Sequence, residues 1–222
     1  MNAPYSRFVT SCRSTRNDAT GIPPAPAGDG PAGTRTILDE EAILEHELAR
    51  RLDPFTPFQS ALLGWAYLYG GDTERAKEQA GRTLELNPDA AFGLFVLGSA
   101  LQVEGDDEAA IATHERMVAL YPWLRWLLGV TYARADRAEE ARRIAREVET
   151  NGPNALDAMG LAVLYGALGD VDASHRWATH EPNHAWLPAL PIDPIVGVPR
   201  EVLEDSRFDE FMARLDLPWW EG

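Results

Sequence analysis

The sequence predicts an all-α protein built as a solenoid, in which helix hairpins stack one after another along the chain. Two observations lead to this prediction. A Leu-x-Pro motif recurs with a period of 34 residues, at 52–54, 86–88 and 120–122. The apolar residues between these motifs follow helical rather than strand spacing. A fixed period of this length is typical of stacked supersecondary units.

A second pattern lies inside each period and predicts how the two helices of a unit pack. Each of three units has a Leu-Gly pair, at Gly64, Gly98 and Gly129, with Ala 12 residues and Pro 24 residues after the Gly. A glycine lets a paired helix approach closely, and we expect the alanine to face it across the hairpin. Glycine and aspartate at 70–72 and 105–107 predict the turns between the helices.

These positions resemble the tetratricopeptide repeat, a 34-residue helix-turn-helix unit with small residues where its helices cross and a proline that ends the second helix. The resemblance implies a right-handed α-solenoid. Two positions depart from the family pattern, the early tryptophan of the first helix and the large aromatic residue of the second. They are here Ser60, Leu94 and Arg125, and Ala80, His114 and Ala145, respectively. We expect altered packing between helices of the same fold.

The chain divides into an arm, a repeat region and a C-terminal cap. Residues 1–35 are rich in Pro, Gly, Ala, Ser and Thr without periodicity, which predicts a disordered arm. Residues 36–54 predict an N-terminal helix that forms a partial repeat, and 187–222 predict a loop followed by one closing helix over 201–215. The solenoid of 55–186 is expected to hold about four repeats, at 57–90, 91–121, 122–154 and 155–182.

The chain is strongly acidic. Its 20 Lys and Arg against 35 Asp and Glu give a formal charge of −15 at pH 7. A surface of this sign repels phosphate backbones, so we expect no nucleic-acid partner. The arm has four Arg and two Asp, a net charge of +2, and residues 36–222 therefore carry −17. Many acidic residues fall on the expected second helices, where they predict a solvated outer face.

The sequence also bears on the compartment. The single cysteine, Cys12, excludes an intrachain disulfide and favours a reducing interior. Residues 9–12 have the small-residue character of a lipid-attachment box, but Arg7 interrupts the apolar stretch that a secretory signal needs. No apolar run is long enough to span a bilayer. We therefore expect a cytoplasmic protein with no membrane partner.

A narrower resemblance comes from three segments, Leu-Asp-Pro at 52–54, LAVLYGALGD at 161–170 and DSRFDEFMARLDLP at 205–218. They are similar to the C-terminal tetratricopeptide module of bacterial signalling proteins, which commonly follows a serine/threonine kinase, a class III adenylate cyclase or a winged-helix DNA-binding domain. The resemblance covers about residues 36–218. Because only the arm precedes the repeats here, it implies a stand-alone interaction module and transfers no catalytic residue.

The expected binding surface is the face formed by the first helices, which line the concave side of such a solenoid. Aromatic side chains dominate the inward stripe of these helices, and aromatic residues are common binding hot spots. The stripe predicts a groove for a peptide or partner protein. The alternative is that the same rings are buried core, or are covered by the arm or tail of the chain. The groove residues are Phe58, Trp65, Tyr69, Phe92, Phe95, Trp123 and Trp126.

One motif points to chemistry. His180, Glu181 and His184 have the spacing of a zinc hydrolase, in which two His bind the metal and the Glu activates water. That site needs a continuous helix, and Pro182 interrupts it. We therefore expect no zinc site, and interpret His175, His180 and His184 as a surface histidine cluster. No phosphate-binding loop or nucleophile motif occurs, so we expect no cofactor and no catalysis.

Three classes of function remain open. The first is a non-enzymatic scaffold that binds a partner in the aromatic groove. The second is a structural module that self-associates into homo-oligomers through its atypical end units. The third is a zinc hydrolase acting through His180 and His184. The sequence favours the first class and does not identify the partner.

Overall fold

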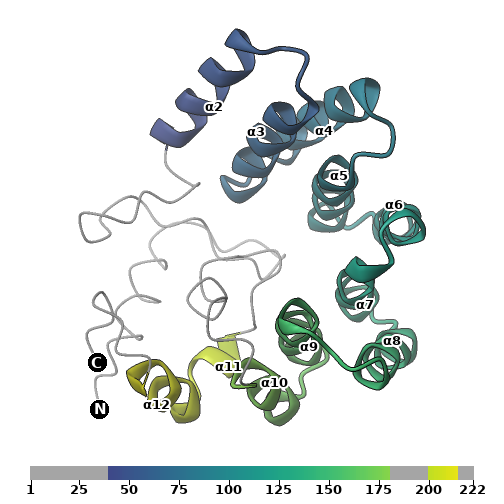
Figure 1. Ribbon diagram of the computed structural model, residues 1–222, viewed down its shortest axis with the longest axis vertical. Helices are drawn as coiled ribbons and strands as arrows, with labels where there is room; N and C mark the ends of the chain where they lie inside the picture. The colour runs from purple at the N-terminus through teal and green to yellow at the C-terminus, as the bar shows by residue number, and fades with distance from the viewer. Residues whose placement is uncertain (1–39, 181–199, 215–222) are drawn as a thin grey trace. The chain divides into compact units, whose positions relative to one another are not determined.

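The structure, a computed structural model, describes residues 40–180 and 200–214 of the chain (Figure 1). All regular elements in these two ranges are helices, which confirms the all-α prediction. Residues 40–122 belong to one compact unit, called here the N-terminal unit. Residues 123–180 and 200–214 belong to another, the C-terminal unit. No helix within the described ranges is long and apolar enough to cross a membrane.

The N-terminal unit consists of a single helix followed by two helix hairpins. The hairpins are α3–α4 and α5–α6, and the helices of each pack against each other. α3 also packs against α2 and α5. Because α3 and α5 are neighbours, the first helices of the two hairpins form one continuous face. The helices are α2 (Glu40–Leu52), α3 (Pro57–Tyr69), α4 (Thr73–Leu86), α5 (Ala91–Val103) and α6 (Asp107–Leu120).

The C-terminal unit repeats the same arrangement. A short 3-10 turn, η1, leads into it, and the hairpins α7–α8 and α9–α10 follow. α7 packs against α9, so the first helices again lie side by side. The elements are η1 (Pro122–Leu124), α7 (Arg125–Arg134), α8 (Ala138–Thr150), α9 (Ala155–Ala167) and α10 (Val171–Ala178).

The closing helix predicted over 201–215 is divided in two within the described residues. Two helices take its place, α11 (Arg200–Leu203) and α12 (Ser206–Arg214). The Asp205 carboxylate accepts the backbone N–H of Arg207 at 2.9 Å, and its carbonyl accepts the N–H of Phe208 at 2.9 Å. Side-chain capping of this kind competes with helix continuation, so Asp205 starts a new helix.

The turn inside each hairpin holds one residue in the left-handed conformation. The φ angle is +78° at Gly71, +82° at Gly105, +57° at Asp136 and +75° at Gly169. In three of these turns the next residue is an aspartate whose carboxylate accepts a backbone N–H three residues later, at 3.0–3.2 Å. The third turn lacks both the glycine and the cap, since its left-handed residue is Asp136 and the residue after it, Arg137, makes no side-chain cap.

Two glycines lie where a paired helix comes close. A Cβ atom added at Gly64 would lie 3.1 Å from the Cβ of Gln79 on α4. At Gly98 it would overlap the imidazole of His114 on α6, at 2.9 Å from Cε1 and closer still to two other ring atoms. The larger His114 side chain therefore fits only because position 98 has no side chain.

Candidate functional site

Five of the seven predicted groove residues lie in the N-terminal unit and contact one another. The three on α3 are spaced seven and four residues apart, which keeps them on one face of the helix. The other two are three residues apart on α5, which packs against α3. We call these five residues the aromatic cluster: Phe58, Trp65 and Tyr69 on α3, and Phe92 and Phe95 on α5.

Phe92 is the centre of the aromatic cluster. Its ring centroid lies 6.0 Å from that of Phe58, 5.3 Å from that of Trp65 and 5.8 Å from that of Phe95. The Phe92 and Phe95 rings are nearly parallel, at 3°, whereas Trp65 meets Tyr69 edge to face at 86° and 5.2 Å. These separations are those of favourable aromatic pairs. The rings therefore hold one another in place across two helices.

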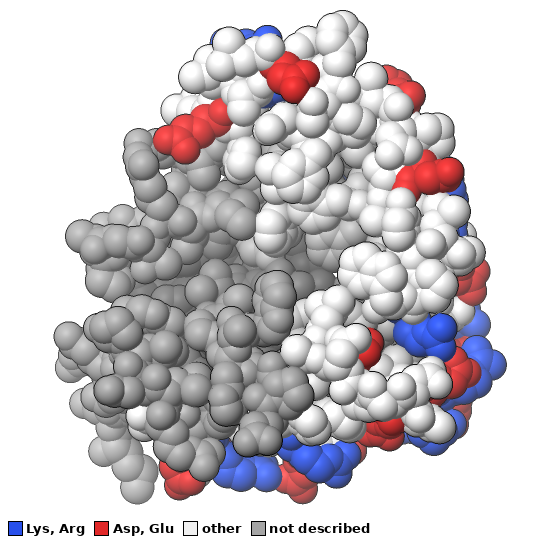
Figure 2. Space-filling view, viewed as in Figure 1, with Lys and Arg blue, Asp and Glu red and all other residues white. Residues whose placement is uncertain are grey.

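The aromatic cluster is open at one end and buried at the other. Phe58 is 56% exposed and Tyr69 is 6% exposed, while Trp65, Phe92 and Phe95 are half-buried. Neither α3 nor α5 contains a charged residue, and Figure 2 shows an uncharged surface over α5. The structure thus presents an apolar patch whose accessible edge is Phe58.

Trp65 has an unused hydrogen-bond donor. Its Nε1 atom is inaccessible to solvent and has no hydrogen-bond partner within the described ranges. An unpaired buried donor costs about 1–3 kcal/mol relative to a paired one.

The remaining two predicted residues, Trp123 and Trp126, belong to the C-terminal unit. Trp123 lies in η1 and is 54% exposed. Trp126 on α7 is 4% exposed. Its ring packs on Gly160 of α9, where an added Cβ atom would lie 2.7 Å from Cδ1 of the indole. Trp126 therefore fills the space between two first helices and belongs to the core of its unit.

His114 contacts the aromatic cluster through the backbone of Phe95. Its Nε2 atom lies 3.4 Å from the carbonyl oxygen of Phe95, and the residue is 1% exposed. Burial lowers the pKa of His114 to about 4, so the side chain is neutral at pH 7. Sequence reasoning noted this histidine only as a departure from the repeat pattern. The glycine at position 98, 16 residues earlier, was the sequence feature that could have indicated a buried histidine here.

His175 is buried, so the prediction that it belongs to a surface histidine cluster is wrong. This residue, on α10, is 3% exposed. Its Nε2 atom lies 3.9 Å from Oδ1 of Asp205, and its ring centroid lies 6.5 Å from that of Phe208. Burial is the main cause that lowers its pKa. His175 is a core residue beneath α11 and α12.

Only the first residue of the zinc-hydrolase motif, His180, lies among the residues that the structure describes. His180 is exposed and stacks on Trp177, with ring centroids 5.2 Å apart. Glu181, Pro182 and His184 lie outside the described residues. Within the described ranges, no group of three or more His, Cys, Asp and Glu residues is placed to hold a metal ion.

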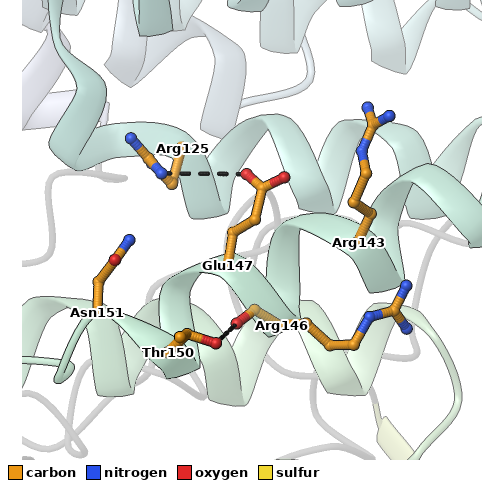
Figure 3. Close-up of a pocket in the computed structure, with 6 residues that line it drawn as sticks. All are labelled: Arg125, Arg143, Arg146, Glu147, Thr150 and Asn151. Atoms are coloured by element: carbon orange, nitrogen blue, oxygen red, sulfur yellow. Dashed lines mark hydrogen bonds and ion pairs between the residues drawn. The ribbon is translucent and has the colours of Figure 1, made fainter.

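An open pocket of about 360 Å³ lies between α7 and α8 (Figure 3). The guanidinium of Arg125 is 4.0 Å from the Glu147 carboxylate, and the Thr150 hydroxyl donates to the carbonyl oxygen of Arg146 at 2.7 Å. The lining combines three arginines with one carboxylate, so it is strongly charged. The lining residues are Arg125, Arg143, Arg146, Glu147, Thr150 and Asn151.

The helix hairpins are similar to those of a known repeat family. A family model described as a tetratricopeptide repeat matches residues 62–90, which contain most of α3 and all of α4. Residues 62–90 are therefore a tetratricopeptide repeat. No curated protein matches the sequence of this repeat protein.

One solved structure similar to this chain is a crystal structure of MamA. The two chains are 21% identical with a TM-score of 0.44, over 61% of this chain and 82% of that chain. The narrower resemblance to modules of bacterial signalling proteins stays a prediction.

Proposed function

We propose that this tetratricopeptide repeat protein is a non-enzymatic scaffold that binds a peptide or partner protein on the aromatic cluster. The aromatic cluster itself is the observation that carries the proposal. It spans two neighbouring first helices, and one edge is open at Phe58, which is 56% exposed. Preorganised aromatic rings lose little conformational entropy on binding and are frequent hot spots.

The surroundings define the chemistry of the partner. With no charged residue on α3 or α5, the patch favours an apolar segment over an acidic or basic one. An extended or helical peptide with a large apolar side chain meets this requirement.

The proposal also covers the class of partner, the compartment and the biological process. The formal charge of −15 argues against a nucleic-acid partner, and the single cysteine favours a cytoplasmic location. The segments shared with bacterial signalling modules suggest a role in bacterial signalling or regulation. The buried, neutral state of His114 is consistent with a structural rather than a catalytic histidine.

Peptide selection followed by affinity measurement tests this proposal. Peptides from a random displayed library are selected on the full chain, and their Kd values are measured by fluorescence anisotropy against Phe58→Ala and Phe92→Ala. We expect each substitution to weaken binding by about tenfold or more, equivalent to about 1.4 kcal/mol. Phe58 is exposed, so its replacement leaves the fold intact.

The matched control is Leu86→Ala. Leu86 is an exposed apolar residue, at 43%, on the second helix α4 rather than on the aromatic cluster. Its loss should leave the affinity unchanged. Selected peptides that bind Phe58→Ala and Phe92→Ala as tightly as the unchanged protein would place the binding surface elsewhere and refute the proposal.

A further inference from the structure

Helix α2 has an apolar face that the described fold leaves uncovered. Leu44, Leu48 and Leu52 are spaced four residues apart, which places them in one row along the 13-residue helix. They are 61%, 53% and 78% exposed, respectively. We call this row the leucine face of α2. Three leucines that are each more than half exposed in one row mark an interaction surface rather than scattered apolar residues.

The rotation of α2 about its axis is set by its packing. The helix packs against α3, and the Tyr67 hydroxyl of α3 donates to the Glu47 carboxylate at 2.7 Å. Ile43, His46 and Arg50 are half-buried, whereas the leucine face lies on the other side of the helix. The leucine face therefore points away from the hairpin that holds α2.

We propose that the leucine face of α2 binds the leucine face of a second copy of this chain, with the two α2 helices antiparallel. The charges of α2 favour a second, antiparallel copy of the same helix as the partner. Glu45 precedes Leu48 by three residues and Arg51 follows it by three, so these two exposed side chains flank the leucine face. An antiparallel pair sets the acidic end of each helix beside the basic end of the other, and it also opposes the two helix dipoles.

The spacing of the leucines sets the register of the pair. Rows of residues four apart on two helices interdigitate in the commonest class of helix packing. Leu48 is the middle residue of the row, so a two-fold axis near Leu48 pairs it with Leu48 of the second copy. Leu44 then meets Leu52 of the second copy, and each copy uses the same surface, as a two-fold dimer requires.

The interface is small, so the dimer should be weak. A helix of 13 residues is about 20 Å long and covers less than the roughly 800 Å² per partner of a standard interface. We expect the full chain to be monomeric at about 1 µM and dimeric at about 500 µM. The aromatic cluster is not part of this surface, so self-association and peptide binding can be tested separately.

Sedimentation equilibrium on the full chain tests the surface. Leu48→Ser should weaken dimerisation by at least about tenfold, since Leu48 meets its own copy at the axis. Leu86→Ser removes a leucine of similar exposure on α4 and should leave dimerisation unchanged. A full chain that remains monomeric at about 500 µM, or equal dimerisation of Leu48→Ser and the unchanged protein, overturns the proposal.

Disulfide cross-linking tests the orientation and register. Single cysteines are placed in a Cys12→Ser background. Leu48→Cys should form a covalent dimer, whereas Leu52→Cys alone should not, because the two copies of residue 52 are about 12 Å apart along an antiparallel pair. A mixture of Leu44→Cys and Leu52→Cys chains should cross-link between the two variants. Cross-linking of Leu52→Cys with itself as fast as Leu48→Cys overturns the antiparallel register.

Discussion

His114 packs so closely against Gly98 that a larger residue at position 98 should destabilise the protein. Alanine at position 98 would place a Cβ atom 2.9 Å from Cε1 of the imidazole and closer to two other ring atoms. His114 is 1% exposed, so the ring has no open space into which it can move. We expect Gly98→Ala to destabilise the protein, although alanine is the better helix former.

Two opposing effects, overpacking and helix propensity, determine how much Gly98→Ala changes the unfolding free energy. Overpacking of a well-packed core costs about 1–3 kcal/mol, and a clash with several ring atoms belongs at the upper end of that range. The change from Gly to Ala inside a helix returns about 1 kcal/mol. The net loss of unfolding free energy should be about 2 kcal/mol. When His114 is also replaced by Ala, the clash is absent, and Gly98→Ala should stabilise by about 1 kcal/mol.

A double-mutant cycle measures this coupling. Unfolding free energies of the unchanged protein, Gly98→Ala, His114→Ala and the double variant are obtained from urea titrations followed by far-UV circular dichroism. The expected coupling energy is about 3 kcal/mol. Gly81→Ala is the control, because a Cβ atom at Gly81 on α4 meets nothing within 4 Å and should stabilise by about 1 kcal/mol.

The reasoning fails if the cycle is additive. Gly98→Ala would then have the same effect with or without the imidazole, and the close approach between α5 and α6 would not constrain the helix pair. A stabilising effect of Gly98→Ala alone, similar to that of Gly81→Ala, would lead to the same conclusion.

Three further predictions concern single residues. Asp136→Gly should raise the unfolding free energy by about 0.5 kcal/mol in a urea titration, because φ is +57° there and glycine holds the corresponding turn positions. Buried His114 has a pKa of about 4, below its ordinary 6.5, so its contribution to stability is complete above pH 6.5 and is lost as the pH falls toward 4. By pH 5 this loss is about 2 kcal/mol, and urea titrations of His114→Gln should not show that part of the pH dependence. Asn154→Ala should cost about 1 kcal/mol by thermal or urea unfolding, since Asn154 accepts two backbone N–H groups at the start of α9; Asn154→Ser, which keeps a cap, should cost less.

The sequence by itself determined the parts of the fold that depend on neighbouring residues. The predicted end of the first helix at residue 54 lies two residues beyond the end of α2, and turn residues such as Gly71 and Gly105 have the left-handed φ angles that such turns need. These features are local, because a helix stop or a turn is decided by a few consecutive side chains. The break at Asp205 is local too, and its Asp-Ser-Arg sequence was readable as a helix start.

Only the tertiary structure decided which side chains are accessible. Phe58 and Tyr69 share one face of α3, yet one is 56% exposed and the other 6%. His175 is buried because α11 and α12, some 30 residues later, pack over it. The leucine face of α2 is exposed because α3 covers only its opposite side. Helical periodicity places a residue on a face of its helix, but burial depends on which other helix covers that face, and this is set by contacts between residues far apart in the sequence.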